Sequence, residues 1–249
     1  MRQRLDRELA ARGLARSRSH AQTMINSGAV SVDGMIITRP AELVESTAQI
    51  NADADHYVSR AAHKLLGVLD DLGLSVSGRA LDAGSSTGGF TQVLLERGCS
   101  QVIAIDVGTD QLAPELRHDP RVTELERTNL RDLGLEHVDY QPVDLVVADV
   151  SFISLTLLIE RFTAVVTPTG QMLLMIKPQF EVGREQLGKG GVVRDPALHR
   201  QAIDQVVAEA RRCGWHPLAT APSRLLGPAG NQEFFALFAR QSAVPGAQG

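Results

Sequence analysis

The stretch LDAGSSTGGFT (Leu81–Thr91) joins the end of a predicted strand to the start of a predicted helix. Gly84, Gly88 and Gly89 have no Cβ, so the backbone can come close to a ligand while the N–H groups of the helix point at it. The spacing differs from the G-x-G-x-x-G pattern of dinucleotide-binding turns. Taken alone, the turn is only a weak indication of a nucleotide-like ligand. The residues around it indicate which ligand binds.

The acidic residue in front of the turn indicates the type of ligand. Asp82 would repel a pyrophosphate, but its carboxylate suits a cofactor that carries an ammonium and a sulfonium cation. We therefore expect S-adenosylmethionine, held by Asp82 together with Gly84, Ser85 and Gly88. The alternative is that Asp82 is only a negative charge that stabilises the N-terminus of the helix.

Two later strand ends supply the rest of the predicted cofactor pocket. The run QVIAIDVG places Asp106, followed by Val107, 22 positions after Gly84, where a carboxylate can accept hydrogen bonds from ribose hydroxyls. After the next strand, Asn129 and Leu130 are predicted to line the adenine slot, Asn129 through its amide. A plain helix cap is the competing interpretation of Asn129.

The pattern around the turn predicts an α/β domain. Helical patterns such as GGFTQVLLERG alternate with strand-like runs, which are RALDAG, QVIAIDVG, RVTELERTN, VDLVVADVS and QMLLMIKP. Five such units predict a parallel, doubly wound sheet. The C-terminal PLATAPSRLLGPAGNQEFFALFAR predicts two further strands joined by a Pro/Gly turn. Five parallel strands plus a C-terminal antiparallel hairpin resemble the Rossmann-like fold of methyltransferases that use S-adenosylmethionine.

The beginning of the chain carries a different charge from the rest. Residues 1–40 hold seven Arg against three acidic residues, a net charge of +4, which leaves −8 for the rest of a chain whose total is −4. A basic arm on an acidic body predicts a module that binds a polyanion. Residues 1–50 contain no aromatic residue, so base stacking is not its expected mode of binding.

The same segment predicts a small α+β domain in residues 1–52. One short helix stops at Gly13, and a second is capped by Ser17 and stops at Gly28. A hairpin follows, with Asp33-Gly34 at its turn.

The remaining boundaries follow from composition. We expect a linker at residues 53–58, the methyltransferase domain at 59–241 and a disordered tail at 242–249.

Composition excludes several classes of protein. Cys99 and Cys213 lie in unrelated contexts and indicate neither a disulfide framework nor a zinc site, so no metal is expected. The N-terminus lacks the apolar core of a secretory signal, and no apolar run approaches the roughly 20 residues that span a bilayer. We expect a cytoplasmic protein without membrane contact.

Four charged residues are predicted at one edge of the sheet. Lys64 lies on the helix before the first strand, Asp149 and Lys177 end the fourth and fifth strands, and Glu233 starts the last strand. Because that strand is antiparallel, its start lies at the edge where the parallel strands end. Burying a charge there is unfavourable unless another group compensates it. We expect the four to meet beside the methyl donor; a structural ion-pair network is the alternative.

These residues carry a specific resemblance. Lys64, Asp149, Lys177 and Glu233 match the Lys-Asp-Lys-Glu tetrad of FtsJ-like ribose 2′-O-methyltransferases. Over roughly residues 4–240, the chain is similar to the TlyA family, through the strings SRAAHKL, LDAGSSTGGFT, DLVVADVSFISL, IKPQFEVG and GNQEFF. The N-terminal pattern, with Leu5-Asp6, ARSR, Ala21, Ile25 and Asp33-Gly34, resembles the S-four type of RNA-binding module.

The resemblance implies methylation of the ribose 2′-oxygen of cytidine in ribosomal RNA. The implied partners are ribosomal RNA or ribosomal subunits, with Arg4, Arg16 and Arg18 facing phosphates, as counterion release also favours. The resemblance implies methylation of the large subunit. It leaves the small subunit open, because the tail of this sequence differs from that of longer family members, which carry an extra C-terminal helix.

The tetrad predicts how the hydroxyl is activated. Methyl transfer from a sulfonium is an in-line displacement, and a ribose hydroxyl is a poor nucleophile until a base removes its proton. Lys177 can do this only as a neutral amine, a form that partial burial and the second cation, Lys64, favour. Asp149 would orient Lys177 and support the positive end of the cofactor, and Glu233 would orient Lys64 or the ribose.

The loop FEVGREQLGKGGVVRDP follows Lys177. We expect a mobile lid over the RNA, with Arg184 and Lys189 as phosphate contacts and the target nucleotide flipped from its stack. A plain surface loop is an equal alternative.

Three other functions remain as alternatives. A non-catalytic RNA-binding or ribosome assembly factor would bind S-adenosylmethionine without turnover. A membrane-active haemolysin, a label given to some family members, would make liposomes leak. A nucleotide-linked oxidoreductase is disfavoured by Asp82 and the C-terminal hairpin. The sequence does not show which nucleotide is modified or whether the substrate is free RNA or an assembled subunit. It also leaves open the oligomeric state and the orientation of the domains.

Overall fold

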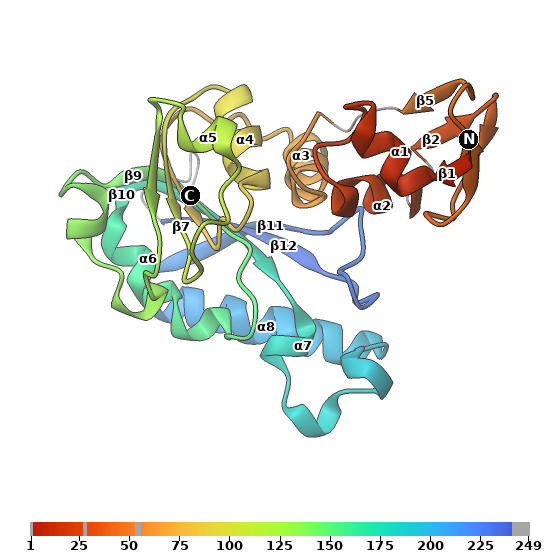
Figure 1. Cartoon of the computed structure of the whole chain (residues 1–249). Coiled ribbons are helices and arrows are strands. Elements are labelled where there is room, and N and C mark those ends of the chain that lie inside the picture. The colour runs from red at the N-terminus through yellow and green to blue at the C-terminus, as the bar shows by residue number, and fades with distance from the viewer. Residues whose placement is uncertain (1, 27–28, 53–55, 241–249) are drawn as a thin grey trace. The chain divides into compact units, whose positions relative to one another are not determined.

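The computed structural model describes residues 2–26, 29–52 and 56–240, apart from the side chain of Arg184. The chain forms two compact units that divide between His56 and Tyr57 (Figure 1). The predicted helix end at Gly28, residues 53–55 of the predicted linker and the predicted tail 242–249 lie outside the described residues.

The first unit packs two helices and short strands around a small core. Leu5 and Leu9 of one helix and Ala21 and Ile25 of the other are fully buried. The second helix begins after Ser17, whose Oγ accepts a hydrogen bond from the His20 N–H at 3.1 Å, as predicted for its cap. The elements in chain order are β1 (Arg2–Arg4), α1 (Leu5–Ala11), α2 (Arg18–Asn26), β2 (Val30–Val32), β3 (Met35–Ile36), β4 (Leu43–Glu45) and β5 (Ile50–Ala52).

The hairpin predicted in this unit is formed by β2 and β3. Asp33 and Gly34 at its turn both have positive φ, +49° and +82°, the backbone that a two-residue type I′ turn requires. Strands β1, β4 and β5 were missed. They pair in the orders β1-β4 and β3-β2-β5, and three residues are too few to show a period-two pattern.

In the described residues, the second unit is built on a seven-stranded sheet in the order β11-β12-β10-β9-β6-β7-β8. The five strands from β10 to β8 are parallel, and β12 runs antiparallel to β10 and β11. The predicted fold class is therefore confirmed. The strands are β6 (Gly78–Ala83), β7 (Cys99–Ile105), β8 (Val122–Leu125), β9 (Val143–Ala148), β10 (Val166–Ile176), β11 (Trp215–Pro222) and β12 (Phe234–Arg240).

Helices cover both faces of this sheet (Figure 1). The α-helices are α3 (Ala61–Leu72), α4 (Gly89–Glu96), α5 (Pro114–Arg117), α6 (Ile159–Val165), α7 (Pro178–Glu181) and α8 (Pro196–Arg212). Short 3-10 helices complete the connections: η1 (Leu130–Asp132), η2 (Leu135–Val138), η3 (Leu155–Leu157), η4 (Arg184–Gln186) and η5 (Lys189–Gly191).

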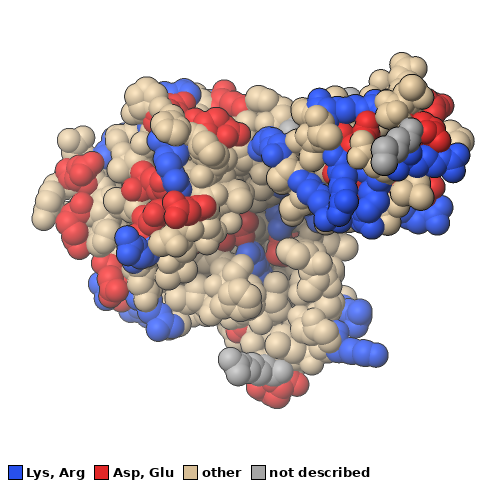
Figure 2. Space-filling view, viewed as in Figure 1, with Lys and Arg blue, Asp and Glu red and all other residues tan. Residues whose placement is uncertain are grey.

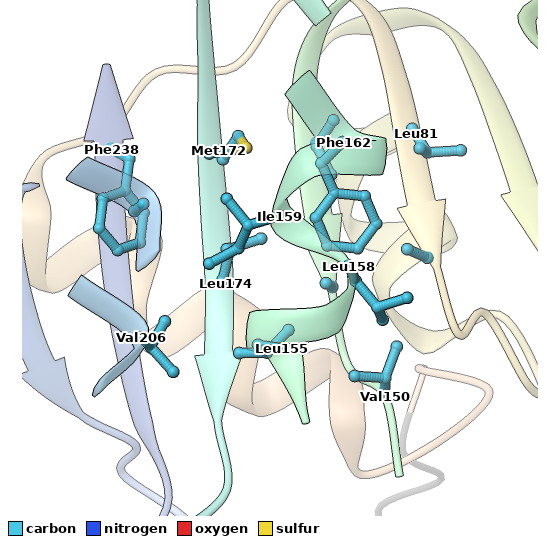
Figure 3. Packing of buried hydrophobic residues seen from close by; sticks show 14 of the residues in the cluster. Leu81, Val150, Leu155, Leu158, Ile159, Phe162, Met172, Leu174, Val206 and Phe238 are labelled. Carbon is cyan, nitrogen blue, oxygen red and sulfur yellow. The ribbon is translucent and has the colours of Figure 1, made fainter. Parts of the chain in front are cut away.

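Alternate residues of each strand enter two separate cores. Leu81 packs with α6 and α8 on one face, whereas its neighbour Ala80 packs with α3, α4 and α5 on the other. Burial on both faces explains why these strands are continuous apolar runs in the sequence. Figure 3 shows the first core, where Phe162 and Ile159 of α6 lie against Leu174 of β10 and Leu81 of β6.

We expect Phe162→Ala to lower the free energy of unfolding of the second unit by about 3–5 kcal/mol, because the ring is fully buried and a cavity would remain. Leu157→Ala is the control. That side chain is 55% exposed, and its loss should change stability by no more than about 0.5 kcal/mol. Denaturant unfolding measures both, and equal losses would contradict the assignment of the core.

Candidate active site

The register of the sheet brings three of the four predicted tetrad residues to one edge. Ala148 at the end of β9 lies beside Ala83 of β6 and Leu174 of β10, and Asp149 follows it. Ile176, the last residue of β10, pairs with Phe234, the first residue of β12. Lys177 and Glu233 therefore occupy the next facing positions, Glu233 one residue before the strand in which it was expected.

Lys177 and Asp149 form an ion pair at this edge. The Lys177 Nζ lies 2.6 Å from Asp149 Oδ1 and donates a hydrogen bond to Ser151 Oγ at 2.8 Å. About 10% of the Lys177 side chain is exposed, enough for contact with a substrate at the surface. Asp149 and Ser151 thus hold the amine at this edge of the sheet.

Lys64 and Glu233 form the second pair. The Lys64 Nζ on α3 donates to Glu233 Oε2 at 2.5 Å, and both side chains are buried. A Cβ at Gly227 would lie 2.5 Å from Glu233 Oε1, so the loop before β12 closes over the carboxylate. Each lysine is thus paired with a carboxylate, and the structure does not bring Lys64 to Lys177 as an unpaired second cation. Removing one partner of a buried pair of this kind strongly destabilises the folded protein, because it leaves an uncompensated buried charge.

Lysine is scarce in this chain, which makes its positions informative. The sequence contains three lysines, Lys64, Lys177 and Lys189, and two of them are the buried amines of the tetrad. Arginine carries the remaining basic charge of the chain. Because arginine stays protonated in proteins whereas lysine can release a proton, lysine suits a position where a base is needed.

The glycine turn lies directly against the end of β9. Gly84 has φ +85°, and a Cβ there would lie 2.7 Å from the Asp149 carbonyl oxygen. The Asp149 N–H donates to the Ala83 carbonyl at 3.0 Å, which holds the two strand ends together. Gly88 also has positive φ, +95°, and a Cβ there would meet Leu112 and Leu116. The turn can close only with glycine at these positions.

Asp82 is buried beneath this turn, and no lysine or arginine of the described residues forms an ion pair with it. Its Oδ2 accepts a hydrogen bond from the Thr91 hydroxyl of α4 at 2.7 Å, whereas Oδ1 is buried and, among the described residues, receives no hydrogen bond. Burial raises the pKa of Asp82 to about 7; the Thr91 hydrogen bond opposes the shift, and the carboxylates of Asp149 and Asp106 add to it. A buried acceptor without a donor is unusual and calls for a ligand.

The other predicted cofactor residues surround the turn. Ser85 is buried, and Asp106 accepts hydrogen bonds from the Ser86 and Gly108 N–H groups at 2.9 and 2.8 Å. Val107 beside Asp106 is 73% exposed, so its side chain is open to contact from outside.

Asn129 and Leu130 follow β8. Asn129 caps η1, since its Oδ1 accepts from the Arg131 N–H at 3.1 Å; its amide hydrogens still provide donors. Leu130 is partly buried against the core shared with α6 and α8.

Three contributors to this site were missed in the sequence: Thr91, Ser151 and Phe152. The first two act through hydrogen bonds to Asp82 and Lys177, which depend on the fold and leave no pattern in the sequence. Phe152 follows Ser151 with φ +64° and is 90% exposed, and its ring lies 5.2 Å from that of Phe180. A non-glycine residue in left-handed backbone marks a site where strain is tolerated, and the sequence carries no signal for this conformation either.

The predicted RNA-binding residues of the first unit surround a buried carboxylate. Asp6 accepts hydrogen bonds from Arg4 Nε and Nη2 at 3.0 and 2.9 Å, from Arg18 Nε at 3.0 Å and from Gln22 Nε2 at 2.9 Å. The Arg4 hydrogen bonds, followed by those of Gln22 and Arg18, hold the pKa of Asp6 well below its usual range. Asp6 therefore fixes two half-exposed guanidinium groups.

Basic side chains gather on the visible face of this unit in Figure 2. Arg16 is exposed, and its Nη2 donates a hydrogen bond to the His56 carbonyl at 3.5 Å. These positions are compatible with phosphate contacts.

The loop after Lys177 is anchored at its C-terminal half. Asn231 Oδ1 accepts from the Val193 N–H at 2.9 Å, and Asn231 Nδ2 donates to the Gly191 carbonyl at 3.2 Å. Lys189 in η5 is exposed. Arg184 begins η4, and its side chain lies outside the described atoms.

Other features of the described residues are separate from the predicted site. A cavity of about 540 Å³ is lined by Ser154, Thr156, Glu181, Gln205, Ala208, Glu209 and Arg212, none of which belongs to the predicted site. No group of three or more His, Cys, Asp or Glu in the described part of the chain is placed to hold a metal ion. No described helix is long and apolar enough to cross a membrane.

The fold and this edge of the sheet define a methyltransferase joined to a small RNA-binding module. The FtsJ-like methyltransferase family matches residues 57–240, and the S4 domain matches residues 3–50. The 16S/23S rRNA (cytidine-2′-O)-methyltransferase TlyA of Mycobacterium tuberculosis is 48% identical over 94% of this chain and 88% of its own length. The chain therefore belongs to the TlyA family of FtsJ-like methyltransferases, as the sequence motifs predicted.

Solved structures agree with this assignment. A candidate hemolysin from Streptococcus thermophilus aligns with a TM-score of 0.76 at 33% identity, covering 98% of this chain and 92% of that one. A candidate S-adenosylmethionine-dependent methyltransferase from Listeria monocytogenes, at 12% identity, shares the fold of 73% of this chain over 100% of its own, with a TM-score of 0.54.

We expect Gly84→Ala to destabilise the protein more than Gly214→Ala and to weaken binding of S-adenosylmethionine at least tenfold. Both positions have nearly the same φ, +85° and +84°, but only at Gly84 does the new Cβ meet a backbone oxygen. The shared backbone strain amounts to roughly 1–2 kcal/mol. Denaturant unfolding and calorimetric titration compare the two variants, and equal effects would show that the contact with Asp149 is unimportant.

Proposed function

We propose that this chain transfers a methyl group from S-adenosylmethionine to the ribose 2′-oxygen of a cytidine in ribosomal RNA. The observation that carries the proposal is the Lys177–Asp149 pair, held at the sheet edge directly against the glycine turn. The name of the Mycobacterium tuberculosis relative, which is 48% identical, supports the substrate.

The residues of the turn fit the cofactor. Asp82 Oδ1 is a buried acceptor that receives no hydrogen bond from the described residues, and a carboxylate there would attract a cationic ligand. Gly84 lets the backbone of the turn approach closely, and Asp106 would accept from ribose hydroxyls. When bound, S-adenosylmethionine supplies a methyl group activated by its sulfonium. We assign Asp82, Gly84, Ser85, Gly88, Asp106, Val107, Asn129, Leu130 and Asp149 to its pocket.

Lys177 is the proposed base. As a neutral amine it takes the proton of the 2′-hydroxyl, so the oxygen becomes a nucleophile as it approaches the methyl carbon. Asp149 and Ser151, at 2.6 and 2.8 Å, fix the position of the amine. Positioning matters because in-line displacement requires the reacting atoms to be aligned. Asp149, paired with the amine, stabilises the positive charge that Lys177 acquires with the proton.

Lys64 and Glu233 are proposed to support this reaction from beside Lys177. Their buried pair fixes the start of β12 against α3, and Glu233 holds the Lys64 ammonium close to the facing position of Lys177. Phe152, exposed beside Ser151, offers an aromatic face on which a flipped base would stack.

The first unit would bind the RNA substrate. Arg4, Arg16 and Arg18 are the proposed phosphate contacts, with Arg184 and Lys189 in the second unit. An RNA of the ribosome as substrate also implies that the enzyme acts in the cytoplasm. The assay described below uses separated ribosomal subunits, so it distinguishes methylation of the large subunit alone from methylation of both.

We expect Lys177→Met and Lys177→Arg both to lower the rate of methyl transfer at least about a hundredfold, because neither side chain can act as a base. Methyl-labelled S-adenosylmethionine and separated unmodified ribosomal subunits measure the rate. The label should resist alkaline hydrolysis in a dinucleotide, since a 2′-O-methyl group blocks cleavage. Arg200→Ala, an exposed residue of α8, is the control and should keep full activity.

The arginine variant separates two roles. If Lys177→Arg retained most of the activity, positive charge rather than proton removal would be the function of this side chain. Label in the base would exclude ribose methylation. Cofactor binding without any label, in the unaltered protein, would favour the assembly factor.

We expect Asp6→Asn to weaken RNA binding by about three- to tenfold, although it removes a negative charge. The reason is that the buried carboxylate fixes the guanidinium groups of Arg4 and Arg18, and hydrogen bonds between charged groups are the stronger ones. Asp33→Asn, at an exposed turn of the same unit, should leave binding unchanged or slightly tighter. Fluorescence anisotropy with a ribosomal RNA fragment tests both, and tighter binding by Asp6→Asn would refute the positioning role.

A further inference from the structure

Asp82 differs from the other fully buried carboxylates of the described residues, Asp6 and Glu233, because each of those is paired with a lysine or an arginine. It is fully buried, its Oδ1 has no hydrogen-bond donor among the described residues, and its Oδ2 has the Thr91 hydroxyl at 2.7 Å. Two further carboxylates act on it, Asp149 from the end of β9 and Asp106 from the end of β7. The Lys177 ammonium at this edge of the sheet lies against Asp149.

These surroundings favour a protonated carboxyl. Burial disfavours the charged form, and two carboxylates add repulsion; together they raise the pKa of Asp82 to about 7 despite the Thr91 hydrogen bond. A cationic ligand beside Oδ1 would reverse the balance, because an opposite charge favours the ionised form. The protonation state of Asp82 is therefore coupled to occupation of the site.

We propose that binding of S-adenosylmethionine expels one proton from Asp82 to the solvent, and that Thr91 is the positioning residue that prepares this carboxylate. The inference rests on the proposed cofactor and concerns how the site receives it. The Thr91 hydroxyl donates a hydrogen bond to Oδ2, which favours ionisation and leaves Oδ1 as the oxygen available to the cation.

The direction of the pH dependence follows from linkage. Above the pKa of Asp82 in the free protein the carboxylate is already charged, and affinity is at its full value. As the pH falls below about 7, the cofactor must displace a proton, and affinity drops by up to tenfold for each pH unit. Without the Thr91 hydroxyl the pKa of Asp82 rises further, so the loss of affinity begins at a higher pH.

Calorimetric titration of the full chain with S-adenosylmethionine tests both parts. At pH 6.5, runs in buffers of different ionisation enthalpy should show release of between about half a proton and one proton. The amino group of the cofactor contributes little there, because an α-amino group titrates at about 7.7–8.0. Thr91→Val keeps the shape of the side chain without the donor, and Thr91→Ser keeps the hydroxyl.

We expect Thr91→Val to shift the midpoint of the affinity profile upward by about one pH unit and therefore to bind S-adenosylmethionine about fivefold more weakly at pH 7. Thr91→Ser should restore the original midpoint. Binding without proton release at pH 6.5 would overturn the proton coupling, and an unshifted profile in folded Thr91→Val would overturn the role of Thr91. Absence of binding at every pH in the unaltered protein would instead overturn the proposed function.

Discussion

The close approach of two strand ends, β6 and β9, is the constraint on which the site depends. The Asp149 N–H binds the Ala83 carbonyl, and Gly84 leaves just enough room for the Asp149 carbonyl beside the turn. One backbone contact thus couples the cofactor turn to the carboxylate that holds Lys177. The antiparallel direction of β12 completes the edge by bringing Glu233 to the same level. Any shift between β6 and β9 would move the base relative to the methyl donor.

Carboxylates serve opposite purposes in the two units, and their surroundings explain the difference. Asp6 is surrounded by donors from Arg4, Arg18 and Gln22, so its charge is stable and organises a basic surface. Asp82 is equally buried, but in the described residues its donors come from Thr91 alone and none is cationic, so its charge is costly until a cation arrives. Asp6 and Asp82 are both fully buried. The number of hydrogen-bond donors around each carboxylate therefore decides whether it is a structural anchor or a binding group.

The sequence predicted the parallel sheet, its antiparallel hairpin and the residues at the strand ends, because apolar runs and glycine turns recur with regular spacing. Lys177 and Asp149 meet as that topology required. Other features of the site could not be predicted from the sequence. Thr91 reaches Asp82, nine positions earlier, only because α4 folds back over the turn. The left-handed backbone of Phe152 has no signature in the sequence. The pair of Lys64 with Glu233 matches one of the two roles expected of Glu233, but the choice between Lys64 and the ribose depended on side-chain directions that strand order does not specify.

The distribution of lysine has a practical consequence for handling the protein. Two of the three lysines are buried in ion pairs, and Lys189 is exposed in η5. A lysine-specific protease acting on the folded chain therefore has one accessible bond in the described residues, directly after Lys189. Cleavage there severs the loop that Asn231 ties to the segment before β12. Resistance of this bond would thus report how firmly the loop is held, separately from the stability of either unit.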